Sequence, residues 1–78
     1  MRATNGTTPV QRPPRYRIEH RADDEPALIV AFADTDLGLR SALAAQVARH
    51  LRTRMSGSLI VVDQETEEIV TVHRLPAT

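Results

Sequence analysis

ALIVAFADTDLGLRSALAAQVARHLRTRM, residues 27–55, is the stretch that decides the fold of this chain. Residues 27–33 are apolar in both alternating phases, which predicts a strand in the centre of a sheet with both faces buried. Asp34, Thr35 and Asp36 follow, and side chains of these types are preferred at the N-cap of a helix. The stretch therefore predicts a central strand that leads directly into a helix.

The predicted helix continues to about Met55, because apolar residues recur at the spacing of one helical face. This apolar stripe consists of Leu39, Leu43, Val47 and Leu51, widened by Ala44, Ala48 and Met55. Arginines occupy the last turns, where positive charge interacts favourably with the helix dipole. Ser56 and Gly57 predict the C-cap, because glycine adopts the left-handed conformation without strain.

Three further segments have strand patterns. Residues 15–21 alternate between polar and less polar side chains, residues 58–62 are apolar on both faces, and residues 69–75 form the last strand. Acidic turns at residues 23–26 and 63–68 separate the strands of two hairpins. The order β-β-α-β-β predicts an α+β fold with one helix packed on a four-stranded, mostly antiparallel sheet.

The length of 78 residues is that of a single domain. Residues 1–14 are polar and contain three prolines, so we expect a disordered or extended N-terminal arm. The folded domain is predicted to span residues 15–75, and residues 76–78 to form a tail. No apolar run has the length of a signal peptide or a membrane span, and we expect a cytoplasmic protein.

The sequence offers no motif for catalysis or cofactor binding. It has no cysteine, which excludes disulfides and thiolate metal sites. His20 and His73 share the apolar phase of the first and last strands and would approach each other if those strands were neighbours. Six carboxylates are predicted to gather at one end of the sheet, namely Asp34, Asp36, Asp63, Glu65, Glu67 and Glu68. Neither group has the spacing of a known metal loop, so we expect a non-enzymatic protein without metal or cofactor.

One helix covers only one face of the sheet. If Leu28, Val30, Phe32, Leu59 and Val61 face the helix, then Ile29, Ile60 and either Thr71 or Val72 lie on the opposite face with nothing to cover them. Exposed apolar patches of this kind mark interfaces. We therefore expect a small protein-interaction module, a regulator, inhibitor or assembly factor, that forms a homodimer and also binds another protein. The partner-binding candidates are Ile29, Ile60, Val72, Arg49 and Arg52.

A second hypothesis is a nucleic-acid-binding regulator. The formal net charge of zero conceals two basic regions, because residues 1–22 hold five arginines against one glutamate and the predicted helix adds four more arginines. Arginine is well suited to binding phosphate. The candidate residues are Arg12, Arg15, Arg17, Arg49 and Arg52. Arg12, Arg15 and Arg17 also enter the fold near the acidic end, so neutralising that end is an alternative role for them.

Overall fold

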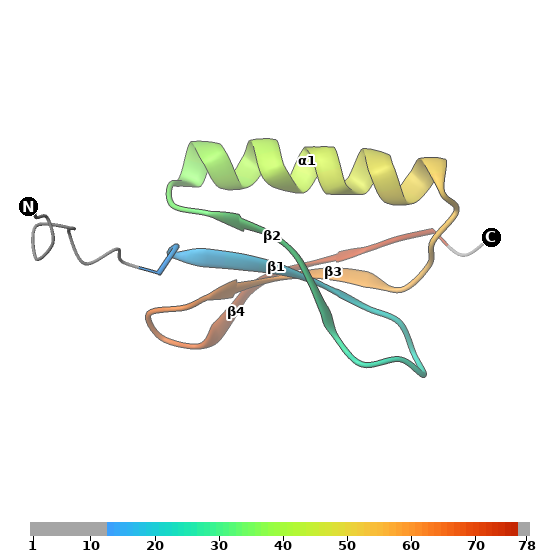
Figure 1. The fold of residues 1–78 in the computed structure, drawn as a ribbon, viewed down its shortest axis with the longest axis horizontal. Helices are drawn as coiled ribbons and strands as arrows, with labels where there is room; N and C mark the ends of the chain where they lie inside the picture. The colour runs from blue at the N-terminus through green and yellow to red at the C-terminus, as the bar shows by residue number, and fades with distance from the viewer. Residues whose placement is uncertain (1–12, 77–78) are drawn as a thin grey trace, which may run out of the picture.

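The computed structural model describes residues 13–76, and the α+β fold predicted from the sequence is confirmed (Figure 1). Its elements are β1 (Tyr16–Arg21), β2 (Leu28–Ala33), α1 (Asp36–Arg52), β3 (Ser58–Asp63) and β4 (Glu68–Arg74). Residues 1–12 and 77–78 lie outside the described part, which therefore excludes nearly all of the predicted arm and most of the predicted tail.

The four strands form one antiparallel sheet in the order β2-β1-β3-β4. The hairpins β1–β2 and β3–β4 lie side by side, so β1 and β3 occupy the centre. The prediction of a central position for residues 27–33 was wrong, because β2 is an edge strand. Its apolar residues do not imply two buried faces, since one face packs beneath α1 while Ile29 and Phe32 on the other are exposed.

A β-bulge shifts the phase of β2. Ile18 pairs with Ala31 but the next residue, Glu19, pairs with Ile29, so one extra residue is inserted in β2. Residues directly opposite each other in antiparallel strands share a face. Phe32, opposite Arg17, therefore lies on the sheet face away from α1, and its side chain is 51% exposed. The prediction that Phe32 faces the helix was wrong, because regular alternation cannot anticipate an inserted residue.

The core lies between α1 and the two central strands. Its fully buried apolar side chains are those of Ile18 in β1 and of Leu59 and Val61 in β3, which confirms the prediction that the last two face the helix. Tyr16 and Leu75 complete this buried cluster, and the helix contributes Leu39, Ala42, Leu43 and Val47, all only partly buried. The helix thus covers the core without burying any of its own apolar side chains completely.

The predicted start of the helix is confirmed and its predicted end was wrong. The hydroxyl of Thr35, the N-cap, accepts a hydrogen bond from the Gly38 amide at 3.0 Å. Helix α1 ends at Arg52 rather than at Met55, because the chain turns at Thr53 and Arg54, the latter in a left-handed conformation with φ of 58°.

Gly57 adopts the predicted left-handed conformation, with φ of 100°, but for another reason than capping the helix. A Cβ atom at this position would lie 2.3 Å from the Arg21 carbonyl oxygen. The glycine therefore allows the start of β3 to approach the end of β1.

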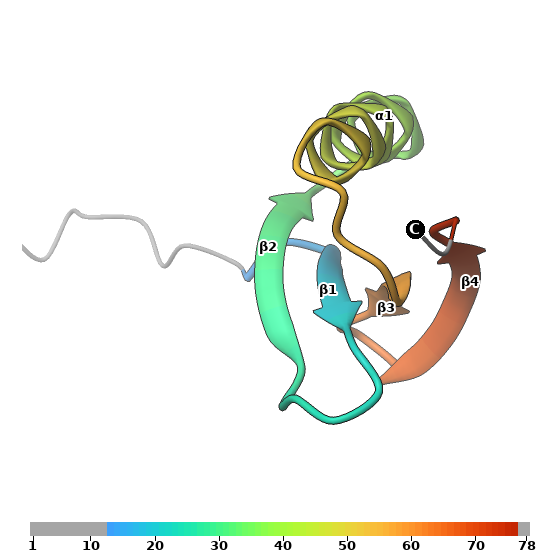
Figure 2. The ribbon, with the colours of Figure 1, turned by 90° about the vertical axis from the view of Figure 1, so that its right-hand side faces the viewer.

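The sheet is curved, and α1 is not centred above it. Figure 2 shows α1 above β2, with β4 curling upward on the opposite side. The helix packs mainly on β2, while β4 receives little cover from it. This off-centre position leaves one side of the helix open. The outer face of the sheet is a second open apolar surface, because α1 packs on the opposite face.

Candidate functional site

The outer face of the sheet, the face away from α1, carries two rows of side chains that cross all four strands. One row is Ile29, Glu19, Ile60 and Val72, and the other is Phe32, Arg17, Val62 and Ile69. In each row the members on β1 and β3 are more buried than the apolar members on β2 and β4, which are about half exposed. The outer face therefore presents two apolar strips, one along each edge strand.

The partner-binding candidates Ile29, Ile60 and Val72 fall into one of these rows. The sequence left Thr71 or Val72 open for the last position, and Thr71, opposite Val61, lies on the helix side. Ile29 and Val72 are exposed at the two ends of the row. The expectation that Ile60 is uncovered was wrong, because it is buried between its cross-strand neighbours Glu19 and Val72. The sequence missed Phe32 because of the bulge in β2. It also missed Ile69, because a second bulge shifts the register of β4 between its pairings with Val61 and Val62.

A row of charged side chains on β1 separates the two apolar strips. The Arg17 Nε donates to the Glu19 carboxylate at 2.5 Å, and the Arg21 Nη2 donates to the other carboxylate oxygen at 2.9 Å. The Arg17 guanidinium also forms a two-point ion pair with Glu67, at 3.0 and 3.1 Å. Glu67 has a left-handed backbone conformation in the β3–β4 turn, so this ion pair ties a strained turn to the central strand.

These contacts determine how the buried Glu19 ionises. Hydrogen bonds from Arg17, and secondarily from Arg21, stabilise the carboxylate and lower the pKa of Glu19, although burial acts in the opposite direction. The pKa of Arg17 is raised, chiefly by its hydrogen bonds to Glu67 and Glu19. The row is thus charged at neutral pH and carries its own counter-ions. The alternation of Arg17, Glu19 and Arg21 along one strand was the sequence signal for it.

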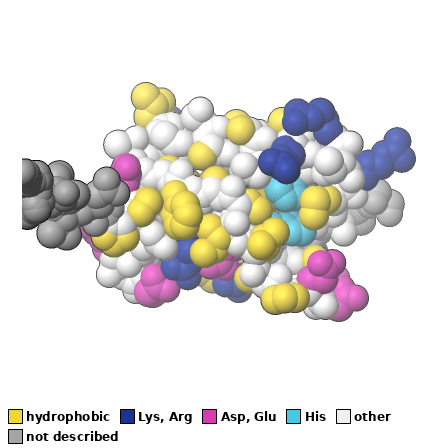
Figure 3. Space-filling model, viewed as in Figure 1, with side chains coloured by type: hydrophobic (Ala, Val, Ile, Leu, Met, Phe, Trp, Pro, Cys, Tyr) yellow, Lys and Arg dark blue, Asp and Glu magenta, His cyan; other side chains and the backbone are white. Residues whose placement is uncertain are grey.

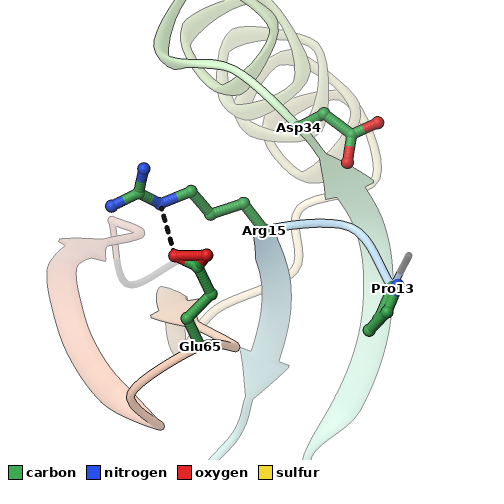
Figure 4. Close-up of a pocket in the computed structure, with 4 residues that line it drawn as sticks. All are labelled: Pro13, Arg15, Asp34 and Glu65. Atoms are coloured by element: carbon green, nitrogen blue, oxygen red, sulfur yellow. Dashed lines mark ion pairs between the residues drawn. The ribbon is translucent and has the colours of Figure 1, made fainter.

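The acidic end of the sheet is neutralised by residues that enter β1. Arg15 contacts Asp63 at 3.5 Å and Glu65 at 3.7 Å, and Figure 4 shows its side chain extending toward Glu65 and away from Asp34. An open, charged depression of about 450 Å³ is lined by Arg15, Asp34, Glu65 and Pro13. Within residues 13–76, no three histidine, aspartate or glutamate side chains converge in a way that could hold a metal ion.

Asp36 has a local structural role at the same end. Its carboxylate accepts a hydrogen bond from the Tyr16 hydroxyl at 2.9 Å, and this bond is the main reason why the pKa of Tyr16 is raised. The bond ties the first turn of α1 to the start of β1, since the two residues lie in those elements.

The arginines proposed for nucleic acid divide into two groups. Arg15 and Arg17 are engaged in the ion pairs with acidic side chains, in agreement with their alternative role, and Arg12 lies outside the described residues. Arg49 and Arg52 are exposed on α1 and take part in none of the ion pairs among residues 13–76. Figure 3 shows arginine side chains gathered over the C-terminal half of α1, at the other end from the acidic group near its N-terminus.

The histidines are arranged differently from the prediction. His20 and His73 do share the helix face, but Leu59 of β3 lies between them, so these two strands are not neighbours. His20 instead meets His50 of α1, with the ring centroids 4.8 Å apart. Both rings are buried, and each has one nitrogen 2.7 Å from a backbone carbonyl oxygen, that of Ser56 for His20 and that of Gln46 for His50. Since a carbonyl oxygen only accepts, both nitrogens act as donors, and the pair links the helix to β1.

Helix α1, the one helix in the described part of the chain, lacks the length and the hydrophobicity needed to cross a membrane. Comparison with protein-family models, with curated proteins and with solved structures finds no match to this chain.

Proposed function

We propose that this chain is a small, non-enzymatic protein-interaction module that forms a homodimer through the outer face of its sheet and serves another protein as a regulator, inhibitor or assembly factor. The observation that carries the proposal is the pair of apolar strips on that face. Their four large side chains, those of Ile29, Phe32, Ile69 and Val72, are each 50–55% exposed. Exposed apolar side chains gathered on one face in this way often mark an interface.

The charged row supports the same interpretation. Glu19 is already buried and paired within one copy, so covering the outer face would not leave it as an unpaired charge. Two-fold symmetry is the commonest arrangement in soluble oligomers, and it would bring two apolar strips of each copy against those of the other.

The expected affinity is modest. Covering the exposed half of one such side chain contributes about 1 kcal/mol, so the eight side chains of a dimer contribute about 8 kcal/mol before the cost of association is subtracted. Since about 8 kcal/mol alone corresponds to a Kd of about 1 µM, subtracting the cost of association moves the expected Kd toward about 1 mM.

Sedimentation equilibrium between about 1 µM and about 1 mM protein brackets this affinity and tests the proposal. We expect a monomer–dimer equilibrium that Phe32→Lys or Val72→Lys shifts toward monomer by at least about tenfold, because each buries a charge in the interface. Leu37→Lys is the matched control, since Leu37 is 78% exposed on α1 and lies off the outer face. A monomer at all concentrations, or equal effects of all three substitutions, would contradict dimerisation through this face.

The nucleic-acid alternative retains one favourable observation. Residues 37–62 contain Arg40, Arg49, Arg52 and Arg54 and no acidic residue. Binding through them would weaken steeply with salt, because each phosphate contact releases counter-ions. Fluorescence anisotropy with a labelled DNA duplex at two salt concentrations tests this. Binding that is lost in the double variant Arg49→Ala/Arg52→Ala would favour the alternative, and the absence of salt-dependent binding would reject it.

A further inference from the structure

The apolar stripe of α1 is wider than the surface that its own sheet covers. Leu39, Leu43 and Val47 pack against the core, but Ala44, Ala48 and Leu51 are exposed. The last three are spaced by four and three residues and so lie along one side of the helix. The prediction that Leu51 belongs to the buried stripe was wrong. Near the end of the helix the buried residue is His50.

The exposed side of the stripe forms one wall of a groove. The groove has a volume of about 470 Å³ and runs between α1 and β4, with His73 of β4 as the opposite wall. Its helical lining is apolar except for one cation: Leu43, Ala44, Val47, Ala48 and Leu51, with Arg40. The groove exists because α1 lies above β2 while β4 is the edge strand on the far side of the sheet (Figure 2).

The borders of the groove carry positive charge that no acidic side chain among the described residues pairs with. Arg40 lines it, and Arg52, one turn beyond Ala48, lies on the same side of α1. Neither arginine belongs to an ion pair among residues 13–76, whereas the arginines of β1 are all paired. This stretch of the chain has no acidic residue between Asp36 and Asp63. A bound segment with both apolar side chains and carboxylates would pack against the apolar lining and pair with the arginines at the borders.

We propose that the α1–β4 groove binds an amphipathic acidic helix of a partner protein, with the apolar face of that helix against Ala44, Ala48 and Leu51 and its carboxylates beside Arg40 and Arg52. A second copy of the chain fits less well, since two-fold packing of α1 on α1 would place these arginines near each other. Residues 1–12 fit no better, because they contain arginine and no acidic residue. The inference rests on the proposed interaction function, but it uses a surface separate from the outer sheet face.

The helical wall from Arg40 to Leu51 is about 17 Å long, so a helix of about 11 residues matches it. The probe is a fluorescein-labelled peptide of that length, with leucines at the i, i+3, i+4, i+7 spacing of one face and glutamates elsewhere. We expect saturable binding in fluorescence anisotropy. Two control peptides replace the glutamates by lysines or keep the composition and scramble the leucine spacing, and both should bind at least about tenfold more weakly.

Substitutions locate the site. Ala48→Asp adds a charge at an exposed position of the groove, and it should weaken peptide binding by at least about tenfold while the circular dichroism stays that of the parent. Arg40→Glu should weaken binding by about fivefold or more. Arg49→Glu is the matched control, because it makes the same charge change in α1 beside the His20–His50 pair rather than in the groove.

Each outcome decides between the occupants. Equal losses in Arg40→Glu and Arg49→Glu, or equal affinity for the scrambled peptide, would show attraction to net charge alone and overturn the proposal. Displacement of the peptide by a DNA duplex with no effect of Ala48→Asp would do the same and favour nucleic acid. Sedimentation of the same samples separates this proposal from dimerisation. A dimer that does not bind the peptide refutes only the groove, and a monomer that binds it refutes only the dimer.

Discussion

Replacing Glu19 by glutamine tests whether the charged row of the outer face stabilises the fold. The substitution keeps the shape of the side chain and removes its charge. In the structure the buried carboxylate accepts charge-assisted hydrogen bonds from Arg17 and Arg21. Such bonds contribute about 1.5–3 kcal/mol each, but Arg17 keeps Glu67 and the half-exposed Arg21 can turn to water. We therefore expect Glu19→Gln to lower the free energy of unfolding by about 2 kcal/mol, and Tm by roughly 10 °C.

The pH dependence of this loss provides the sharper test. The pKa of Glu19 is lower in the folded protein than its ordinary value of 4.5, so the folded state binds fewer protons than the unfolded state as this residue titrates. Its stabilising contribution is present in full above the unfolded pKa and is lost as pH falls through the lowered folded pKa. The difference in Tm between parent and Glu19→Gln should therefore be constant near neutral pH and shrink progressively below about pH 4.5.

The assay is thermal unfolding followed by circular dichroism at a series of pH values from 7 downward. Glu68→Gln is the matched control, because Glu68 is exposed and takes part in no ion pair among the described residues. It should unfold within about 0.5 kcal/mol of the parent. A difference in Tm between parent and Glu19→Gln that stays constant down to acidic pH, or equal losses in the two variants, would refute the reasoning.

Three further substitutions test the core, the histidine pair and the close approach of β1 and β3 by urea unfolding. Ile18→Ala should lower the free energy of unfolding by about 2–4 kcal/mol, because it leaves a cavity at a fully buried position between the helix and the sheet. A loss below about 1 kcal/mol would contradict the assigned core. His50→Gln should lower the free energy of unfolding by about 1–2 kcal/mol, whereas His73→Gln should change it by less than about 0.5 kcal/mol. Equal effects of the two substitutions would contradict the different environments of the two rings. Gly57→Ala should cost more than 1 kcal/mol, because a Cβ would meet the Arg21 carbonyl in a left-handed backbone; an unchanged urea midpoint would show that the approach relaxes freely.

The sequence by itself determined the elements of this protein and their order. The N-cap at Thr35 and the helix after it, as well as the two hairpins and the helix-facing positions of Leu59 and Val61, follow from local patterns. These features depend on residues close in sequence, through capping, helical spacing and the alternation along a strand. The location of Ile29 on an uncovered face followed from the same alternation, which left Thr71 and Val72 as alternatives in the last strand.

The tertiary structure alone decided which strands lie at the centre and which residues meet across the sheet. One bulge lies in β2 and another in β4, and each inserts a single residue that reverses the alternation of side chains along its strand. The bulge in β2 moved Phe32 to the outer face. The meeting of His20 with His50 and of Arg17 with Glu67 joins residues 30 or more positions apart, and local pattern does not encode such pairs.

The extent to which α1 is covered was likewise not fixed by the sequence. A helical stripe shows which residues are apolar, but the position of α1 above β2 decides which of them are buried. That position buries Leu39 and Leu43 in part and leaves Ala48 and Leu51 in an open groove. The sequence thus determined that the helix has an apolar side, and only the packing of the layers determined how much of that side remains for a partner.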